Sequence, residues 1–469
     1  MPISLILDCG ATNVRAVAID HQGKLLASYH YANQVNSQGN NGYLVWDFET
    51  IYQKLIAAAQ HTISQLTPEF IEDIVAIGVT TFGVDGAPFD NKGNQLYPII
   101  SWQCPRTLEV MNALYQQFDM SQLYQANGIA KQSFNTLFKL RWLQQNERDI
   151  YQKMAKFVFI SSMINQRLTG RFTTDRTMAG TSMMTNLVGD DLWHSDVFAL
   201  LNIDEGHFAE VVNAGEIIGL LDKDIVSQIG LIKPIPVVSC GHDTQFAILG
   251  SGAGLNQPVL SSGTWEILMT RVKKVQDLSS YQNQGLTVEL DAQQGLLNPA
   301  MQWLGSAVLE WVGRTFFADV YQQSNYYTTM INEAEQARES TNPTKFVGKF
   351  DISEPTSQLT GLSIHTRRGQ IYLAALSFMA EQLRVNLQCL QELANFTPTK
   401  LICVGGGSKN RLWNQLRANA IQLPIDIVDV SETTALGAAM NVFYGIGIYQ
   451  SIEQAQQLMQ ASYQRIYPN

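Results

Sequence analysis

Two short segments, one at the start of the chain and one in its second half, share a pattern that constrains the fold strongly. In the first, apolar and β-prone residues 4–8 and 14–20 flank a turn that contains a glycine. In the second, residues 258–261 and 267–270 flank a similar turn. Such a pattern predicts a pair of strands joined by a tight turn. Its recurrence indicates an internal duplication.

Helical and β-prone segments alternate around these strand pairs. A helix is predicted over residues 49–65, followed by a strand over 74–80. Residues 369–394 carry apolar side chains at three- and four-residue spacing, which predicts a long helix with one face in the core. A strand over 401–404 and a helix over 410–421 follow. Alternation of this kind predicts an α/β fold.

The length of the chain predicts two domains. A chain of 469 residues exceeds the size at which a single hydrophobic core usually divides. Hydrophobic residues make up 45% and charged residues 15%, which is typical of a globular protein. We place the boundary between Ala247 and Pro258, giving domains 1–250 and 251–469. The polar stretch 340–355 is expected to be a surface excursion.

The net charge bears on the partners of the protein. A formal charge of −10 argues against a nucleic-acid groove, which needs an excess of Lys and Arg. A nucleotide remains compatible with an acidic chain, because backbone N–H groups, a few local cations and a metal ion can supply positive potential. We therefore expect small-molecule partners and no nucleic acid.

Cysteine usage and hydropathy bear on the location of the protein. The five cysteines are widely spread and no pair has the C-x-x-C spacing of a zinc or redox site. The apolar run 3–7 is too short for a signal peptide, and no run is long enough to cross a bilayer. We expect a reduced, cytoplasmic protein with no membrane partner.

The first glycine turn suits an anionic ligand. Converging backbone N–H groups in a tight turn bind phosphate, and hydroxyl, amide and guanidinium side chains add donors. The residues with these properties are Gly10, Ala11, Thr12, Asn13 and Arg15. Asp8, at the end of the preceding strand, can hold Mg²⁺ directly or through water. An ordinary hairpin turn with an exposed arginine is the alternative interpretation.

Two further glycine turns lie in the second half. Gly263 and Thr264 form the turn of the second strand pair. Gly405, Gly406 and Gly407 stand between a predicted strand and helix, with Asn410 at the start of the helix. Consecutive glycines let a ligand lie against the backbone and face the helix N-terminus. Common Ser-Gly turns and a flexible connection are the alternatives. No Walker A sequence is present.

Asp243 is the candidate for a catalytic base. It follows a predicted buried strand over 235–239, in the segment Gly241-His242-Asp243-Thr244. An aspartate at such a strand end can accept the proton of a substrate hydroxyl as it attacks the γ-phosphate. Taken alone, capping of a helix over 244–249 is the better explanation.

The order of these four segments resembles that of the FGGY carbohydrate kinases, which belong to the actin/hexokinase-like ATPases. The similarity runs over essentially the whole chain. It implies two actin/hexokinase-like (ribonuclease H-like) domains with a nucleotide and sugar cleft between them. Residues 1–250 would form mainly the sugar side and 251–469 mainly the nucleotide side.

Finer similarities narrow the expected substrate. The segments that resemble the branch of the family acting on L-fuculose are 5–13, 80–86, 134–137, 179–182, 242–244 and 261–268. Of these, 80–86 and 242–244 also resemble, less closely, the branch acting on L-rhamnulose. The resemblance implies ATP-dependent phosphorylation of L-fuculose to L-fuculose 1-phosphate, with Mg²⁺. Another ketose, such as L-rhamnulose or a pentulose, remains the alternative within this class.

The resemblance also implies roles for individual residues. Asp243 would be the base, and Asp8 and Asp243 would lie nearest the metal. The residues expected to bind ATP are Gly10, Ala11, Thr12, Asn13, Arg15, Gly263, Thr264, Gly405, Gly406, Gly407 and Asn410. Those expected to bind the sugar are Gly83, Asp85, Trp102, Arg106, His242, Asp243 and Thr244. Cys104 and Pro105 depart from the usual family pattern beside Arg106.

Two interpretations from other classes were weighed. A non-catalytic actin-like sensor would bind ATP and sugar without transfer, and the Asp243 segment argues against it because a sensor needs no base. A nucleotide-dependent oxidoreductase is suggested by the G-x-G-x-G run that begins at Gly250. That run follows a predicted helix and precedes a strand, the reverse of a dinucleotide-binding context, so we reject it. The sequence makes no prediction of oligomeric state.

Overall fold

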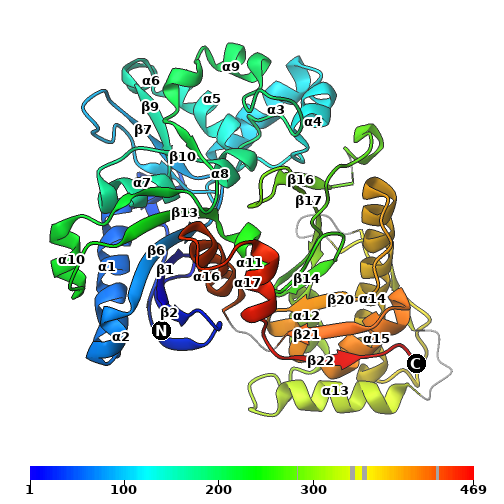
Figure 1. Cartoon of the computed structure of the whole chain (residues 1–469). Coiled ribbons are helices and arrows are strands. Elements are labelled where there is room, and N and C mark those ends of the chain that lie inside the picture. Colours follow the sequence, from blue (N-terminus) through cyan, green and yellow to red (C-terminus); the bar gives the residue numbers. More distant parts are fainter. Residues whose placement is uncertain (283, 339–343, 351–355, 429–431) are drawn as a thin grey trace. The chain divides into compact units, whose positions relative to one another are not determined.

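The computed structural model describes residues 1–282, 284–338, 344–350, 356–428 and 432–469. The chain forms two compact units (Figure 1). The first unit comprises Met1–Gly254, Asp277–Asn298 and Glu432–Ala461. The second comprises Leu255–Gln276, Pro299–Ser431 and Ser462–Asn469. A single cut near residue 250 therefore does not describe the compact units, because two later segments return to the first.

A mixed six-stranded sheet in the order β12-β13-β6-β1-β2-β3 forms the centre of the first unit. Its strands are β1 (Ile3–Cys9), β2 (Asn13–Asp20), β3 (Leu25–Ala32), β6 (Ile74–Thr81), β12 (Ile217–Leu220) and β13 (Pro236–His242). β1, β2 and β3 pair as an antiparallel meander, while β6 runs parallel to β1 and β13 parallel to β6. Every residue of β1 is buried, as expected for a central strand covered on both faces.

Helices and short strands surround this sheet. The helices are α1 (Phe48–Ser64), α2 (Pro68–Glu72), α3 (Leu108–Gln117), α4 (Met120–Asn127), α5 (Thr136–Asn146), α6 (Arg148–Lys153), α7 (Ile160–Thr169), α8 (Arg176–Gly180), α9 (Ser195–Leu201), α10 (Lys223–Ile229), α11 (Asp243–Gly250), α16 (Thr433–Gly445) and α17 (Ile452–Leu458). The short strands are β4 (Asn36–Gln38), β5 (Tyr43–Trp46), β7 (Gly86–Phe89), β8 (Ile99–Ile100), β9 (Lys156–Phe159), β10 (Thr174–Asp175), β11 (Val211–Val212) and β16 (Thr287–Leu290).

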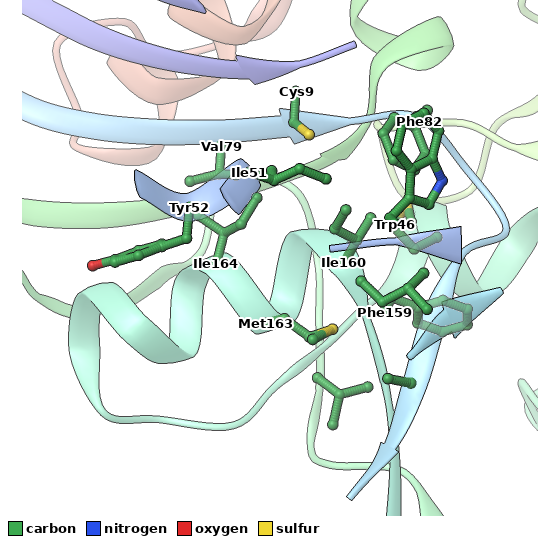
Figure 2. Packing of buried hydrophobic residues seen from close by; sticks show 14 of the residues in the cluster. Cys9, Trp46, Ile51, Tyr52, Val79, Phe82, Phe159, Ile160, Met163 and Ile164 are labelled. Carbon is green, nitrogen blue, oxygen red and sulfur yellow. The ribbon is translucent and has the colours of Figure 1, made fainter. Parts of the chain in front are cut away.

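The core of the first unit follows from the two-residue alternation of its strands. Cys9 and Val79 point to one face, where Ile51 of α1 and Ile164 of α7 pack against them (Figure 2). Gly78, one residue before Val79, lies against α16, since an added Cβ there would meet the side chain of Val442 at 2.6 Å. Helices therefore cover both faces of the sheet.

In the second unit, strands lie side by side in the order β17-β15-β14-β20-β21-β22. Their bounds are β14 (Val259–Ser262), β15 (Trp265–Met269), β17 (Leu297–Leu304), β20 (Leu401–Val404), β21 (Ile425–Val428) and β22 (Tyr463–Ile466). The remaining elements are α12 (Ser306–Phe316), α13 (Tyr326–Ala337), α14 (Arg368–Ala394), α15 (Arg411–Ile421), β18 (Lys345–Val347) and β19 (Gln358–Thr360). α12, α13, α14 and α15 share a core cluster that includes Trp413.

The two units repeat the same strand topology, which confirms the duplication predicted from the strand–turn–strand segments. In each, a meander of three antiparallel strands (β1-β2-β3 and β14-β15-β17) adjoins two parallel strands (β6-β13 and β20-β21). An antiparallel strand lies beside the last parallel strand in each unit: β12 pairs with β13 in the first, and β22 pairs with β21 in the second.

The predicted elements are found within one or two residues of their expected bounds, apart from two segments. The strand predicted over 235–239 extends three residues further, to His242. The Gly405–Gly407 segment, predicted as a loop, contains a short 3₁₀ helix over Gly406–Lys409. Of the polar stretch 340–355, residues 340–343 and 351–355 lie outside the described residues. None of the helices in the described part of the chain has both the length and the apolar character that a bilayer span requires.

Candidate active site

The first glycine turn joins β1 to β2 and is held by backbone hydrogen bonds. The amide of Gly10 donates to the carbonyl of Asn13 at 2.9 Å, and the side chain of Asn33 donates to the carbonyl of Gly10 at 2.9 Å. An added Cβ at Gly10 would lie 3.0 Å from the carbonyl oxygen of Asn13, so the turn leaves little room for a side chain. Thr12 and Asn13 are exposed. The turn therefore presents polar donors to solvent from a fixed backbone.

Arg15 and Asp8 lie beneath this turn on paired positions of β2 and β1. The Nε of Arg15 donates to Oδ2 of Asp8 at 2.6 Å, and Nη1 forms an ion pair with Glu432. The hydroxyl of Thr80 donates to the other oxygen of Asp8 at 3.0 Å. Arg15 is thus held between two carboxylates and keeps a quarter of its side chain exposed.

The end of β13 is shaped by a sharp backbone bend at Gly241. Its φ of 114° favours glycine, and an added Cβ would lie 2.0 Å from Oδ1 of Asp175. Asp175 is buried and accepts hydrogen bonds from the backbone of Thr177 and from the hydroxyl of Ser239 at 2.9 and 2.8 Å. The hydroxyl of Thr177 accepts from the amide of His242 at 2.8 Å. These contacts fix the backbone that carries His242 and Asp243.

Asp243 is the first residue of α11, and its side chain is 30% exposed. Helix capping, the competing explanation from the sequence, is not observed: the N-cap position is His242, with no side-chain cap. Burial raises the pKa of Asp243 to about 6, with His242 opposing the shift and Asp8 adding to it. A carboxylate with a pKa near 6 is ionised at neutral pH and basic enough to accept a proton from a hydroxyl.

His242 lies between two carboxylates. Its Nε2 is 3.5 Å from Oδ1 of Asp243, and its Nδ1 is 3.3 Å from Oε2 of Glu289 on β16. Glu289 in turn accepts hydrogen bonds from Thr181 at 2.7 Å and from Gln245 at 2.8 Å. The hydroxyl of Thr244 donates to Asp243 at 3.3 Å.

The loop after β6 packs directly against His242. An added Cβ at Gly83 would lie 2.8 Å from Nε2 of His242. Val84 has a φ of 61°, an unusual value for a β-branched residue. Its carbonyl accepts hydrogen bonds from Thr136 at 2.8 Å and from Lys139 at 3.2 Å, which hold this conformation.

Asp85, predicted to line the sugar pocket, is fully buried. It forms an ion pair with Lys139 and accepts hydrogen bonds from Nε1 of Trp46 at 2.7 Å and from the amide of Trp102 at 3.1 Å. Burial raises the pKa of Asp85, and Lys139 opposes that shift. In this arrangement Asp85 fixes the Gly83 loop and the Trp102 backbone.

Trp102 and Arg106 differ in accessibility. Trp102 is 37% exposed, with its ring edge-on to that of Phe134. Arg106 is buried, donates to Gln38 at 2.9 Å and packs its guanidinium over the ring of Tyr43. Trp102 is accessible to a ligand, whereas Arg106 is occupied by protein groups.

In the second unit, the Gly263–Thr264 turn joins β14 to β15 above a buried ion pair. Arg417 and Glu266 are both fully buried and in contact. The guanidinium of Arg417 donates to the hydroxyl of Ser262 at 2.7 Å, and Nε1 of Trp303 donates to Glu266 at 3.0 Å. Burial raises the pKa of Glu266, opposed by Arg417. Thr264 is exposed at the turn.

The three consecutive glycines have different surroundings. Gly405 has a φ of 89°, and an added Cβ would lie 2.6 Å from the carbonyl oxygen of Ser262. At Gly407 it would lie 2.1 Å from Oγ of Ser262. Gly406 faces open space among the described residues. The side chain of Asn410 caps α15 by accepting from the amide of Trp413 at 3.1 Å. Ser262 packs so closely against Gly405 and Gly407 that neither position has room for a side chain.

The predicted magnesium residues, Asp8 and Asp243, are carboxylates whose charges act on each other. Within the described ranges there is no group of three or more His, Cys, Asp or Glu side chains arranged to hold a metal. Mg²⁺ is usually bound by one or two carboxylates together with phosphate oxygens and water. A pair of carboxylates therefore fits an ion that also binds phosphate oxygens and water.

Sequence reasoning missed several residues of this site. The polar and charged side chains that it did not single out are Trp46, Lys139, Asp175, Gln245, Glu289 and Glu432. Lys139 had a local signal, because it lies among apolar residues on the buried side of α5. Glu289 and Glu432 had none, since their partners lie far away in the sequence.

Comparison with known proteins identifies the family of this chain. The N-terminal domain model of the FGGY family of carbohydrate kinases matches residues 3–250, and the C-terminal domain model matches residues 259–446. The chain is 54% identical to L-fuculokinase of Haemophilus influenzae over 474 residues, covering 100% of both chains. It is 42% identical to L-fuculokinase of Escherichia coli strain K12, covering 99% of this chain and 97% of the relative.

A solved structure shows the same fold. Xylulose kinase from Rhodospirillum rubrum superposes with a TM-score of 0.89 at 19% identity, covering 99% of this chain and 94% of that one. Both family models together span most of the chain, and the full-length relatives exceed 40% identity. The chain therefore belongs to the FGGY family of carbohydrate kinases.

Proposed function

We propose that this protein transfers the γ-phosphoryl group of ATP to L-fuculose, giving ADP and L-fuculose 1-phosphate. The observation that carries the reaction type is Asp243, a partly exposed carboxylate with a pKa near 6 at the start of α11. The substrate follows from the full-length relatives named L-fuculokinase, at 54% and 42% identity.

The proposed roles of the site residues follow from their chemistry. Asp243 would accept the proton of the sugar hydroxyl as that hydroxyl attacks the γ-phosphate. The Gly10 turn and Arg15 would bind phosphates, and Gly263, Thr264 and the Gly405–Gly407 segment would contact the nucleotide. Asp8 and Asp243 would hold Mg²⁺, which neutralises phosphate charge when bound. Gly83, Trp102, His242 and Thr244 would line the sugar site.

Phosphoryl transfer depends mainly on positioning and charge neutralisation, because its transition state is loose. The many contacts that fix Gly241, His242 and the Gly83 loop are consistent with this requirement.

The division into a sugar side (1–250) and a nucleotide side (251–469) and the cytoplasmic location remain predictions. Asp85 and Arg106 are better explained as residues that fix the sugar side than as direct ligands.

A panel assay tests the substrate. ADP release from Mg-ATP is coupled to NADH oxidation and measured with L-fuculose, L-rhamnulose, D-ribulose, L-xylulose and glycerol. We expect the highest kcat/KM with L-fuculose. A higher value with another ketose would replace the substrate and keep the reaction type. Binding of ATP without sugar-stimulated ADP release would favour the sensor alternative.

The pKa of Asp243 predicts the pH dependence of the reaction. Because the base must be ionised, kcat/KM for the sugar should fall about tenfold per pH unit below a pKa near 6. Rates measured between about pH 5 and 8 in buffers of constant ionic strength check this. A profile that stays flat down to about pH 5 would contradict the assignment of Asp243 as the base.

Substitution of Gly83 tests the packing beneath His242. Gly83→Ala should displace the imidazole, since the new Cβ would lie 2.8 Å from Nε2. Displacements of this size lower kcat/KM for the sugar by roughly tenfold to a hundredfold. The KM for ATP should be unchanged.

Gly254→Ala is the matched control, because among the described residues no heavy atom lies within 4 Å of its added Cβ. Equal losses in both variants, or a change confined to the KM for ATP, would show that the Gly83 loop does not act on the sugar side.

A further inference from the structure

Two buried side chains of α5 meet at one backbone carbonyl in the loop between β6 and β7. The hydroxyl of Thr136 donates to the carbonyl of Val84 at 2.8 Å, and Nζ of Lys139 donates to the same oxygen at 3.2 Å. Both side chains are buried, and all three residues belong to the first compact unit. The first turn of α5 therefore holds this loop by its backbone.

Val84 needs such support because its backbone is strained. Its φ of 61° lies in the left-handed region, where a β-branched side chain crowds the backbone. The residue is 5% exposed, so the strain lies inside the protein and not in a solvent-facing turn. A conformation of this kind persists only where the surrounding contacts enforce it. Strained backbone enforced in this way often lies at functional sites.

We propose that Thr136 and Lys139 are positioning residues for the sugar site, which act through the carbonyl of Val84. By holding Val84 in its left-handed conformation, they fix Gly83 and Asp85, the residues on either side of it. In this role neither side chain of α5 touches the sugar. This inference rests on the proposed function, because it assigns the residues that fix the proposed sugar side.

Both neighbours of Val84 lead to residues of the proposed sugar site. Gly83 lies against the imidazole of His242, since an added Cβ would be 2.8 Å from Nε2. Asp85 accepts a hydrogen bond from the amide of Trp102 at 3.1 Å. A rotation of the Val84 backbone would therefore reach the imidazole on one side and the Trp102 backbone on the other.

Lys139 has a second contact that a test must separate from the first. It forms an ion pair with Asp85, and both side chains are buried. Removal of one partner of a buried pair destabilises a protein whatever the role of the pair, because it leaves a charge uncompensated. The carbonyl contact is therefore best tested first at Thr136, which carries no charge.

The variant Thr136→Val removes one hydrogen bond to the Val84 carbonyl and keeps the shape of the side chain. We expect kcat/KM for the sugar to fall about threefold to tenfold, the usual effect of losing one hydrogen bond. The KM for ATP should be unchanged, because the proposed nucleotide turns are untouched. Steady-state kinetics with each substrate varied in turn measure both values.

Thr62→Val is the matched control. Thr62 is also a buried threonine of the first unit, and its hydroxyl donates to the carbonyl of Ala16 at 3.0 Å. Its loss should cost similar stability and leave kcat/KM for the sugar unchanged. An equal fall in both variants, or an unchanged value in Thr136→Val, would overturn the proposal.

The double variant Lys139→Met/Asp85→Asn tests the lysine and keeps the proposal testable if Thr136→Val does not fold. It removes both charges of the pair, whereas the reference variant Asp85→Asn keeps the contact of Lys139 to Val84. We expect kcat/KM for the sugar to be roughly tenfold to a hundredfold lower in the double variant than in the reference. Equal values in the two would overturn the role of Lys139.

A third substitution distinguishes positioning from a general loss of stability. Glycine adopts the left-handed region without strain, so Val84→Gly removes the need for the contacts from α5. Added to Lys139→Met/Asp85→Asn, it should recover at least about fivefold of the lost kcat/KM, as expected for the release of such strain. A purely structural role predicts no recovery, and that result would overturn the proposal.

Hydrogen exchange separates failure of this inference from failure of the proposed function. If another ketose proves to be the substrate, the kinetics are measured with that sugar. If no sugar is phosphorylated, amide exchange of the segment 82–86 is compared in Thr136→Val and Thr62→Val by mass spectrometry. We expect faster exchange in Thr136→Val, because the loop has lost a contact that holds it. Equal exchange in the two variants would overturn the inference.

Discussion

Replacing Asp243 by asparagine should lower the turnover number for L-fuculose by about 10²- to 10⁴-fold, the usual contribution of a general base. The amide has nearly the same size but cannot accept the proton of the sugar hydroxyl. Because the phosphate turn at Gly10, the second-unit turns and the other proposed Mg²⁺ carboxylate, Asp8, are untouched, the affinity for ATP should change little. Steady-state kinetics measure the turnover number, and calorimetry measures the affinity for ATP.

Asp196→Asn is the control for Asp243→Asn. Asp196 is also an aspartate in the first turn of a helix, α9, but it is exposed and distant in sequence from the site segments. Its loss should alter only a weak helix-terminus interaction. Normal turnover in Asp243→Asn would show that another group accepts the proton, and the base would have to be reassigned.

Replacing Arg417 by methionine should destabilise the second unit by about 3–5 kcal/mol. The substitution leaves Glu266 with an uncompensated charge in a site where both partners are fully buried. It also removes the hydrogen bond to Ser262, against which Gly405 and Gly407 pack. Urea unfolding followed by tryptophan fluorescence should show the loss, because Trp413 lies directly against the Arg417 guanidinium.

Two further variants serve as controls for this prediction. Arg384→Met removes the cation of an exposed ion pair on α14 and should change stability by less than about 1 kcal/mol. The double variant Arg417→Met/Glu266→Gln should recover part of the lost stability, because it removes the buried charge. An Arg417→Met protein as stable as Arg384→Met would mean that the buried pair does not hold the glycine turns.

The fold was largely predictable from local patterns. The β1 and β14 meanders, α1 and α14 were found where apolar periodicity and turn residues predicted them, because each is determined by a short continuous segment. The return of residues Asp277–Asn298 and Glu432–Ala461 to the first unit was not predicted. Such a return depends on contacts between distant segments, which leave no periodic signal.

The same distinction applies to the site. Asp243, His242 and the Gly10 turn are contiguous motifs, and the structure places them on fixed strand ends as expected. The Glu289 contact to His242 joins residues 47 positions apart (289 minus 242), and no local pattern marks it. Local motifs can also be recognised without revealing what the side chain contacts. Asp85 and Arg106 stand in such motifs, but Asp85 is paired with Lys139 and Arg106 with Gln38.

Identification of the product formed from L-fuculose tests the central proposal most directly. The protein is incubated with Mg-ATP and L-fuculose, and the mixture is followed by ³¹P and ¹³C NMR. We predict one phosphorylated sugar, with phosphate on O1, formed in equal amount to ADP by the wild type and strongly diminished with Asp243→Asn. ADP formed with inorganic phosphate in place of a sugar phosphate, or a phosphate on another oxygen, would contradict the proposed reaction.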